Sequence, residues 1–186
     1  KYLVTSALPY ANAPLHLGHV LEIVQTDVWV RQKNLSNEEA LYFCASDTHG
    51  TPIMLKAKEM NVTPEELIKD IHEKHHQTFK SFNVKLANFH STHSEENKHL
   101  TADIFQNALE NNYIHKKEIS QLYDESEHIF LADRFVRGTC PACGAKEQYG
   151  DACEKCGSTY DALELENPIS VLSNTTPVVK ESEHYF

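Results

Sequence analysis

The feature that most constrains the fold is a junction near the start of the chain, where a strand-like segment gives way to a helical one. Residues 9–19 read PYANAPLHLGH and hold His16, Gly18 and His19. The preceding run at residues 3–5 is rich in residues that favour a buried β-strand. From Leu17 onward the apolar residues recur at helical spacing, which predicts an inward face made of Val20, Leu21, Val24 and Val28.

The same alternation continues along the first 112 residues. ALYFCAS at 40–46 predicts a second buried strand, in which Cys44 is packed, and it runs into the turn DTHGTP. Thr63, Pro64 and Glu66 predict a capped helix start, and a third strand is expected near 84–89. A further helix is expected over 94–111, with Leu100, Ile104, Phe105 and Ala108 inward. Strands and helices in this order predict an α/β fold with a parallel sheet.

The pattern changes after Tyr113, where short strand-like pieces flank the cysteines. We therefore predict two domains: residues 1–112, and a smaller β-rich domain over 113–186 that contains the cysteines of 140–156. The chain begins at Lys1 rather than methionine, and its last residues, HYF, have no helix-end or tail composition. We expect it to be a piece of a longer protein.

The charge balance and the cysteines limit the classes of function. The formal net charge of -10 argues against a surface that binds nucleic acid everywhere, although it leaves room for a local basic groove. No apolar run has the length of a membrane span, and no signal-peptide pattern is present. Four of the five cysteines form two CxxC pairs, which suits a reducing compartment. We expect a cytoplasmic protein with no membrane partner.

Two histidines at the start of a helix point to phosphate chemistry. In an open parallel sheet, ligands bind beyond the carboxyl ends of the strands. A helix that starts there offers free backbone N–H groups and the positive end of its dipole. His16 and His19 lie three positions apart and can face one ligand, while Gly18 allows a close approach. With 12 histidines in the chain, a chance pair of surface histidines is the alternative.

The cysteine quartet has the spacing of a metal site. Cys140 and Cys143 form one CxxCG, and Cys153 and Cys156 form a second. Two such turns offer four thiolates in tetrahedral arrangement, which suits a structural Zn²⁺ with no open position. Iron bound by four thiolates is the other assignment. Redox-active pairs are disfavoured, because no single CxxC opens a helix as in thioredoxin-like sites.

These motifs together resemble the bacterial-type methionyl-tRNA synthetases, a family of class I aminoacyl-tRNA synthetases. The resemblance rests on VTSALPYANAPLHLGH, DTHGTPI, FHSTHSEEN, CPACG and CEKCG, in that order, and covers essentially the whole chain. Ala13 stands where many relatives have glycine. The resemblance implies a Rossmann-like catalytic domain, of which residues 1–112 would be the first half. Residues 113–186 would be part of a connective domain inserted into it.

The resemblance also implies the reaction and the roles of residues. ATP, with Mg²⁺, would react with L-methionine to give methionyl-adenylate, which then esterifies tRNA(Met). His16 and His19 would be catalytic. The implied ATP-binding residues are Tyr10, Asn12, His16, Gly18 and His19, and the implied methionine-binding residues are Ala7, Leu8, Tyr10 and Asp47. Asp47 would hold the substrate's α-ammonium, because a zwitterionic amino acid needs a fixed anion.

Several of these residues have simpler interpretations. Asp47 alone would be read as an Asx-turn or cap residue, Tyr10 as a core aromatic, and His49 as a turn histidine. FHSTHSEENK could suggest a metal cluster, but Thr92 and Ser94 before an acidic first turn predict a helix cap instead, and no metal is assigned there.

Another class I synthetase is an alternative within the same resemblance, but ALPYANAPLHLGH is most similar to the methionine family. Two other functions compete with the synthetase assignment. One is a stand-alone HxGH nucleotidyltransferase, which would lack the cysteine module. The other is a non-catalytic zinc-ribbon module that binds RNA, which the acidity of the chain disfavours. The sequence contains no KMSKS, the second signature of the synthetase family. We therefore expect the chain alone to be inactive in aminoacylation and to bind tRNA weakly.

Overall fold

The computed structural model describes residues 1–186 and divides them into two compact units, Lys1–Ala102 and Asp103–Phe186. Helix α4 (Glu95–Glu110) runs across the division between them. No helix is long and apolar enough to cross a membrane. The assignment of residues 1–112 and 113–186 to a catalytic half and an inserted domain stays a prediction.

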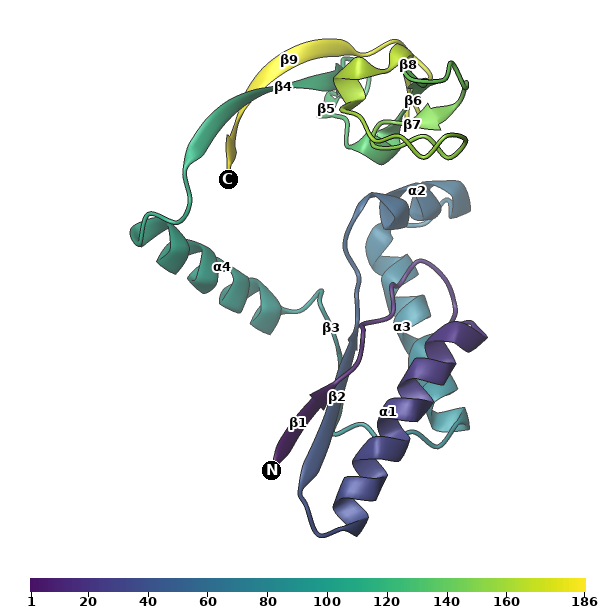
Figure 1. The fold of residues 1–186 in the computed structure, drawn as a ribbon, viewed down its shortest axis with the longest axis vertical. Helices are drawn as coiled ribbons and strands as arrows, with labels where there is room; N and C mark the ends of the chain where they lie inside the picture. Colours follow the sequence, from purple (N-terminus) through teal and green to yellow (C-terminus); the bar gives the residue numbers. More distant parts are fainter. The chain divides into compact units, whose positions relative to one another are not determined.

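The first unit is built on a parallel sheet of three strands in the order β1-β2-β3, as Figure 1 shows. Helix α1 connects β1 to β2, and helices α2 and α3 connect β2 to β3. The elements are β1 (Tyr2–Thr5), α1 (Leu17–Leu35), β2 (Ala40–Ser46), α2 (Thr51–Met60), α3 (Pro64–Ser81) and β3 (Asn88–Ser91). The α/β fold with a parallel sheet is confirmed.

Helices α1 and α3 pack on one face of this sheet (Figure 1). The side chains of β2 alternate in burial, and Tyr42 and Cys44 on its covered face are 1% and 7% exposed. They share a core with Ile23 and Val30 of α1 and Phe79 of α3. The prediction that Cys44 is a packing residue is thereby confirmed. Strand β1, at the sheet edge, is mostly exposed and is not the buried strand that was expected.

The predicted inward face of α1 was wrong. The helix buries Ile23, Asp27 and Val30, whereas Leu21 and Val28 are each 59% exposed. A charged residue can lie on the core-facing side of the helix because both oxygens of its carboxylate accept hydrogen bonds. Asp27 accepts a 2.5 Å bond from Arg31 Nε and a 3.0 Å bond from the backbone N–H of Lys85. An apolar pattern alone does not predict such a buried, paired carboxylate.

Two other helices differ from the expectation in opposite ways. Helix α4 forms as predicted, but its supposed inward residues Leu100, Ile104 and Phe105 are exposed. Helix α2 forms where only a turn was predicted, and it ends at Asn61, whose left-handed conformation separates it from α3. The third strand lies over residues 88–91 rather than 84–89.

The start of α3 follows the prediction. The Thr63 hydroxyl accepts a bond from the backbone N–H of Glu66, and the Glu66 carboxylate accepts one from the backbone N–H of Thr63. This reciprocal capping box, with Pro64 in the first turn, fixes where the helix begins. Leu67, Ile71 and Phe79 of α3 are buried, whereas Phe82, just after the helix, is 51% exposed.

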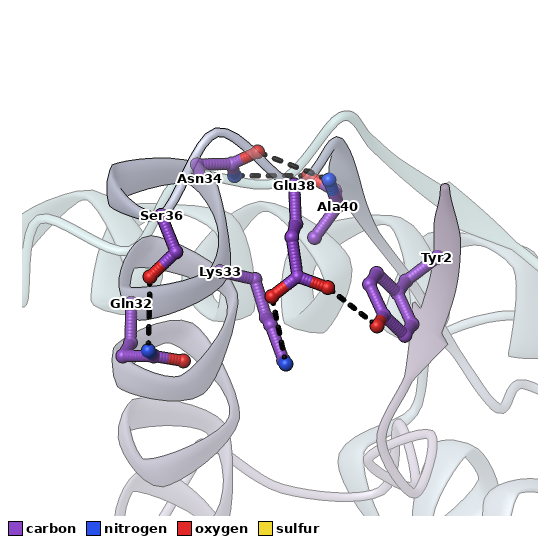
Figure 2. A network of polar contacts seen from close by, with 7 residues as sticks. All are labelled: Tyr2, Gln32, Lys33, Asn34, Ser36, Glu38 and Ala40. Carbon is purple, nitrogen blue, oxygen red and sulfur yellow. Dashed lines mark hydrogen bonds and ion pairs between the residues drawn. The ribbon is translucent and has the colours of Figure 1, made fainter.

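A polar network holds the end of α1 against the start of β2 (Figure 2). The Asn34 side chain makes two 3.0 Å bonds with the backbone N–H and C=O of Ala40. The Glu38 carboxylate accepts bonds from the Tyr2 hydroxyl at 2.6 Å and from Lys33 Nζ at 3.0 Å. These contacts raise the pKa of Tyr2 and lower that of Glu38. The network sets the register at which β1 and β2 enter the sheet.

We expect Asn34→Ala to lower the free energy of unfolding of the first unit by about 1–2 kcal/mol, because two backbone groups at the strand start lose their partners. Trp29, the single tryptophan of the chain, lies in this unit, so its fluorescence during urea unfolding is the measurement. Gln32→Ala is the matched control, since Gln32 bonds only the exposed Ser36 hydroxyl on the same helix. Equal stabilities of the two variants would contradict the role of Asn34.

The second unit contains two small antiparallel sheets, with strand orders β5-β4-β9 and β7-β6-β8. The first is dominated by the pairing of the long strands β4 and β9 along eight residue pairs, Lys116↔Tyr185 through Tyr123↔Val178. The strands are β4 (Lys116–Asp124), β5 (Ile129–Phe130), β6 (Val136–Thr139), β7 (Gln148–Tyr149), β8 (Glu166–Ser170) and β9 (Val178–Tyr185), and the short helices are η1 (Asp133–Phe135) and η2 (Ala162–Glu164).

Asp124, at the end of β4, is a buried polar anchor of this unit. One carboxylate oxygen accepts bonds from the backbone N–H groups of Ser126 and Glu127, and the other accepts a 2.5 Å bond from the Ser173 hydroxyl. These donors, together with Ser170, outweigh burial and lower the pKa of Asp124 to about 2. The carboxylate therefore ties the β4–β5 turn to the segment that follows β8 while staying ionised.

Candidate functional site

The carboxyl edge of the parallel sheet brings two predicted site residues together. Beyond β1 the chain continues beside the end of β2, where Tyr10 and Asp47 form a parallel bridge. The backbone N–H of Ala11 donates to the Asp47 carbonyl at 2.7 Å, and the Asp47 N–H donates to the Pro9 carbonyl at 2.9 Å. The loop 9–19 thus starts as an extension of the sheet, at the edge where parallel sheets bind ligands.

His16 and His19 form a reciprocal cap at the start of α1. Nδ1 of His16 accepts a bond from the Gly18 N–H at 3.1 Å, and Nδ1 of His19 accepts one from the His16 N–H at 3.4 Å. The two rings stack with centroids 3.7 Å apart. Because both Nδ1 atoms are acceptors, each neutral ring carries its proton on Nε2. The cap therefore leaves two Nε2–H donors for a ligand at the positive end of the helix.

The environment of His19 favours its neutral form. Burial lowers its pKa, the neighbouring His16 lowers it further, and Glu22 opposes both effects. A neutral imidazole suits this cap, because protonation of Nδ1 would remove the acceptor for the backbone N–H of His16.

Gly18 is required by the position of the His16 ring. A Cβ at residue 18 would lie 2.9 Å from Cε1 and 3.1 Å from Nδ1 of His16. We expect Gly18→Ala to displace this ring and to weaken the cap, costing about 0.5–2 kcal/mol of stability. Leu17→Ala is the control, because Leu17 is 82% exposed and lies beside the same cap. Urea unfolding followed by Trp29 fluorescence measures both variants, and equal midpoints would contradict the steric role.

The remaining predicted residues line the same edge. The backbone N–H of Ala7 donates to the Glu22 carboxylate of α1 at 2.9 Å, while the Leu8 side chain is 43% exposed. Asn12 is half-buried in the loop. The Asp47 side chain is half-buried, and no hydrogen bond or ion pair to it is present within the chain. That carboxylate is therefore free to pair with a cationic group of a ligand.

Tyr10 packs as a partly buried aromatic, which was its simpler interpretation from the sequence. Its ring packs on a buried cluster formed by α2 and α3, and burial raises the pKa of its hydroxyl. The hydroxyl lies over Gly50, where an added Cβ would be 3.0 Å from it. Tyr10 therefore also anchors the loop to the start of α2, whatever it contributes to a ligand.

Three further side chains at this edge were missed by sequence reasoning. His75 of α3 is fully buried, with Nε2 3.0 Å from the Ala13 carbonyl and Nδ1 3.3 Å from the Ser46 hydroxyl. The same hydroxyl lies 2.9 Å from Nδ1 of His72. His75 lies at helical spacing from Ile71 and Phe79, but this spacing does not show which groups the ring would bond.

These histidines make the stability of the first unit depend on pH. Burial lowers the pKa of His19, His72 and His75 below 6.5. The unfolded chain then binds more protons than the folded chain between the folded pKa values and about 6.5, so stability falls as the pH falls through that range. We expect the urea midpoint reported by Trp29 to be constant above about pH 7 and to decrease towards pH 5.5. A midpoint that is unchanged or rises on acidification would contradict this.

The loops after β2 and β3 are tied to each other at the same edge. The Thr48 hydroxyl and the Thr92 hydroxyl are 2.8 Å apart, and Nε2 of His49 is 3.3 Å from Nδ1 of His93. The Ser94 hydroxyl accepts a bond from the backbone N–H of Asn97, so the predicted cap of α4 is confirmed. His49 therefore links the loop after β2 to the loop after β3 through its contact with His93.

The four cysteines of the second unit converge on one point. Their Sγ atoms all lie within 4.8 Å of one another, with Cys140–Cys156 at 3.9 Å and Cys143–Cys153 at 3.7 Å. Four sulfurs at Zn–S distances of about 2.3 Å in a tetrahedron lie about 3.8 Å apart. The donor set and its spacing therefore fit a four-thiolate zinc ion.

Two matching backbone turns present these thiolates. The Gly144 N–H donates to the Cys140 carbonyl at 3.0 Å, and the Gly157 N–H donates to the Cys153 carbonyl at 2.8 Å. Both glycines are left-handed, with φ of 69° and 76°. Bonds from Ser158 lower the pKa of Cys156 to about 6, which favours the thiolate that a metal needs. Cys140 and Cys153 are buried, which shields one side of the site from solvent.

Comparisons with known proteins agree with this geometry. The family model for class I tRNA synthetases (M) matches residues 2–186. One similar solved structure is Mycobacterium tuberculosis methionyl-tRNA synthetase in complex with methionyl-adenylate. It is 18% identical with a TM-score of 0.65, and the match covers 99% of this chain and 31% of that one.

A second is the Agrobacterium radiobacter K84 agnB2 LeuRS, in a ternary complex with tRNA and LeuAMS. It is 16% identical with a TM-score of 0.66, and the match covers 100% of this chain and 20% of that one. The chain thus spans about a third or less of the length of these proteins, and the similarity confirms the Rossmann-like synthetase fold. The family match also includes the cysteine quartet, which a stand-alone nucleotidyltransferase would lack.

Proposed function

Because the chain belongs to the class I tRNA synthetases, we propose that it forms part of the site at which methionine is activated by ATP and then joined to tRNA(Met). The observation that carries the proposal is that the histidine cap of α1 and the carboxylate of Asp47 both lie at the carboxyl edge of the sheet. One group suits phosphates and the other suits an ammonium, and an amino acid and ATP together present both. We place the reaction in the cytoplasm, with protein synthesis.

ATP, accompanied by Mg²⁺, is proposed to lie with its phosphates at the N-terminus of α1. The methionine carboxylate attacks the α-phosphorus, pyrophosphate leaves, and negative charge grows on the phosphate oxygens. The Nε2–H groups of His16 and His19 donate to these oxygens, and the helix dipole stabilises the same charge. No covalent bond to the protein is needed, so positioning and charge stabilisation account for the catalysis. Gly18 and Asn12 would lie beside the nucleotide.

Methionine is proposed to lie between β1 and the Asp47 carboxylate. Asp47 would pair with the α-ammonium, and Ala7, Leu8 and Tyr10 would line the pocket. The choice of methionine over leucine rests on the motif wording of the sequence and on the family description (M). Glu22 would support this pocket by holding the backbone of Ala7.

The cysteine quartet is proposed to hold one structural Zn²⁺. Cys140, Cys143, Cys153 and Cys156 use every position of a tetrahedral ion, so the ion would stabilise its surroundings and take no part in the chemistry. Residues 113–186 would then be a metal-stabilised insertion in the catalytic domain.

The overall reaction tests this proposal. In a protein that continues this chain to the length of its relatives, we expect tRNA(Met) to be charged with methionine and not with leucine. The chain of residues 1–186 alone is expected to charge no tRNA and to bind it weakly. Charging with leucine, or charging by the chain alone at the rate of the longer protein, would refute the corresponding part of the proposal.

A further inference from the structure

A chain of hydrogen bonds runs from α3 to the loop that carries the histidine pair. The Ala13 carbonyl can only accept, so Nε2 of His75, 3.0 Å away, must donate to it. Nδ1 of a neutral His75 is then an acceptor, and the only group near it with a proton to give is the Ser46 hydroxyl at 3.3 Å. The hydroxyl has a single proton, so the bond at 2.9 Å from His72 must come from Nδ1–H of that ring.

The direction of every bond in this chain is therefore fixed. His72 donates to Ser46, Ser46 donates to His75, and His75 donates to Ala13. Ser46 and His75 are each fully buried, so no water replaces a missing partner. The His72 ring is held in turn by stacking on Phe89, at 4.6 Å between centroids and 1° between planes.

Two members of this hydrogen-bond series, Ser46 and Ala13, lie next to parts of the proposed active site. Ser46 is the last residue of β2 and directly precedes Asp47, while Ala13 lies in the loop between Tyr10 and the cap at His16. We propose that His75, oriented by Ser46 and His72, is a positioning residue that holds the phosphate-binding loop in register with the ammonium-binding carboxylate. The consequence for catalysis rests on the proposed function, whereas the bond directions do not.

The arrangement excludes a charged His75. Protonation of Nδ1 would remove the acceptor for the Ser46 hydroxyl proton, because the other ring bonded to that hydroxyl, His72, is itself a donor. The titratable groups around the two rings are His76 and Glu73 on the same helix, His19 on α1 and His90 on β3. All but Glu73 are cationic when protonated and so disfavour a second charge. The hydrogen-bond relay formed by His72, Ser46, His75 and Ala13 is therefore uncharged at physiological pH.

Two variants at position 75 separate the effect of the hydrogen bond from the effect of side-chain volume. In His75→Gln the side-chain amide can keep a donor near the Ala13 carbonyl, whereas His75→Leu keeps a similar volume without any donor. His76→Gln is the matched control, because His76 is the next residue, is half-buried and packs against Phe89 without a hydrogen bond to Ser46 or Ala13. If His75→Leu does not fold, the tautomers in the unmodified chain still decide the proposal.

The first measurement is of imidazole tautomers by ¹⁵N NMR on the 186-residue chain. We expect protonated Nε2 on His75 and protonated Nδ1 on His72, together with slow exchange of the Ala11 and Gly18 amides. The exchange should be faster in His75→Leu and close to the unmodified chain in His75→Gln and His76→Gln. The opposite tautomer on either ring, or loop amides unaffected by His75→Leu, would overturn the relay.

The second measurement is methionine activation in the longer protein. We expect His75→Leu to lower kcat about 100-fold with little change in the KM for methionine, and His75→Gln to restore most of it, because a misplaced loop costs rate rather than affinity. Full activity of His75→Leu would refute the positioning role while leaving the proposed function intact. No activation in the unmodified longer protein would refute the proposed function, and the tautomers would still decide the relay.

Discussion

Removing the metal from the cysteine site is expected to unfold the surrounding part of the second unit. Apparent binding free energies for structural zinc are about 10–16 kcal/mol, which is as large as the whole stability of a typical small domain. The neighbourhood of the site offers little to replace the ion. Its buried cluster consists of Cys140, Ala145 and Cys153, with Tyr160 packed against it.

The measurement is a chelator titration followed by near-ultraviolet circular dichroism of the tyrosines, alongside the metal content of the purified chain. We expect one zinc per chain, loss of the tyrosine signal on chelation, and the same loss in Cys153→Ser. Cys44→Ala is the matched control, because Cys44 is a packing residue in the first unit. A chain that keeps its signal after complete removal of zinc would contradict the structural role. Iron in place of zinc would correct the identity of the ion.

Loss of either histidine of the α1 cap is expected to slow formation of the adenylate by about 100- to 1000-fold, the usual cost of removing one donor to a developing negative charge. His16→Asn separates this effect from the capping effect, since asparagine is itself a strong N-cap. We expect His16→Asn to unfold like the unmodified chain but to form the adenylate as slowly as His16→Ala.

The measurement is single-turnover formation of the adenylate in the longer protein, which isolates the chemical step from product release. His99→Ala is the control, because His99 is exposed on α4 and touches neither the loop nor β2. Rates within about threefold of the unmodified enzyme in both His16→Asn and His19→Ala would show that the phosphates lie elsewhere.

Local sequence patterns predicted where the helices and strands of the first unit lie better than they predicted which side of each helix is buried. Thr63, Pro64 and Glu66 located the start of α3 because a capping box is made within four consecutive residues. The inward face of α1 was misjudged because Asp27 is buried through bonds to Arg31 and to the backbone of Lys85, and the latter is distant in sequence. Nothing in the local periodicity of α1 contains that information.

In the candidate site, too, groups close in sequence were predicted and contacts between distant segments were not. The histidine pair and the cysteine quartet were found because their members are close in sequence, and the structure brings each set together. Their roles toward substrates and metal remain proposals. The bond between His75 and Ser46 was not predicted, because it joins α3 to β2 and its role depends on the Ala13 carbonyl in a third segment. The sequence did offer one indication: His75 lies at a core position of α3, and a buried imidazole needs hydrogen-bond partners.

The most direct test of the account is exchange of pyrophosphate into ATP by the longer protein, measured with methionine, with leucine and without an amino acid. We predict exchange that requires methionine and is lost in His19→Ala. Exchange that requires leucine, or none with any amino acid while ATP still binds, would contradict it.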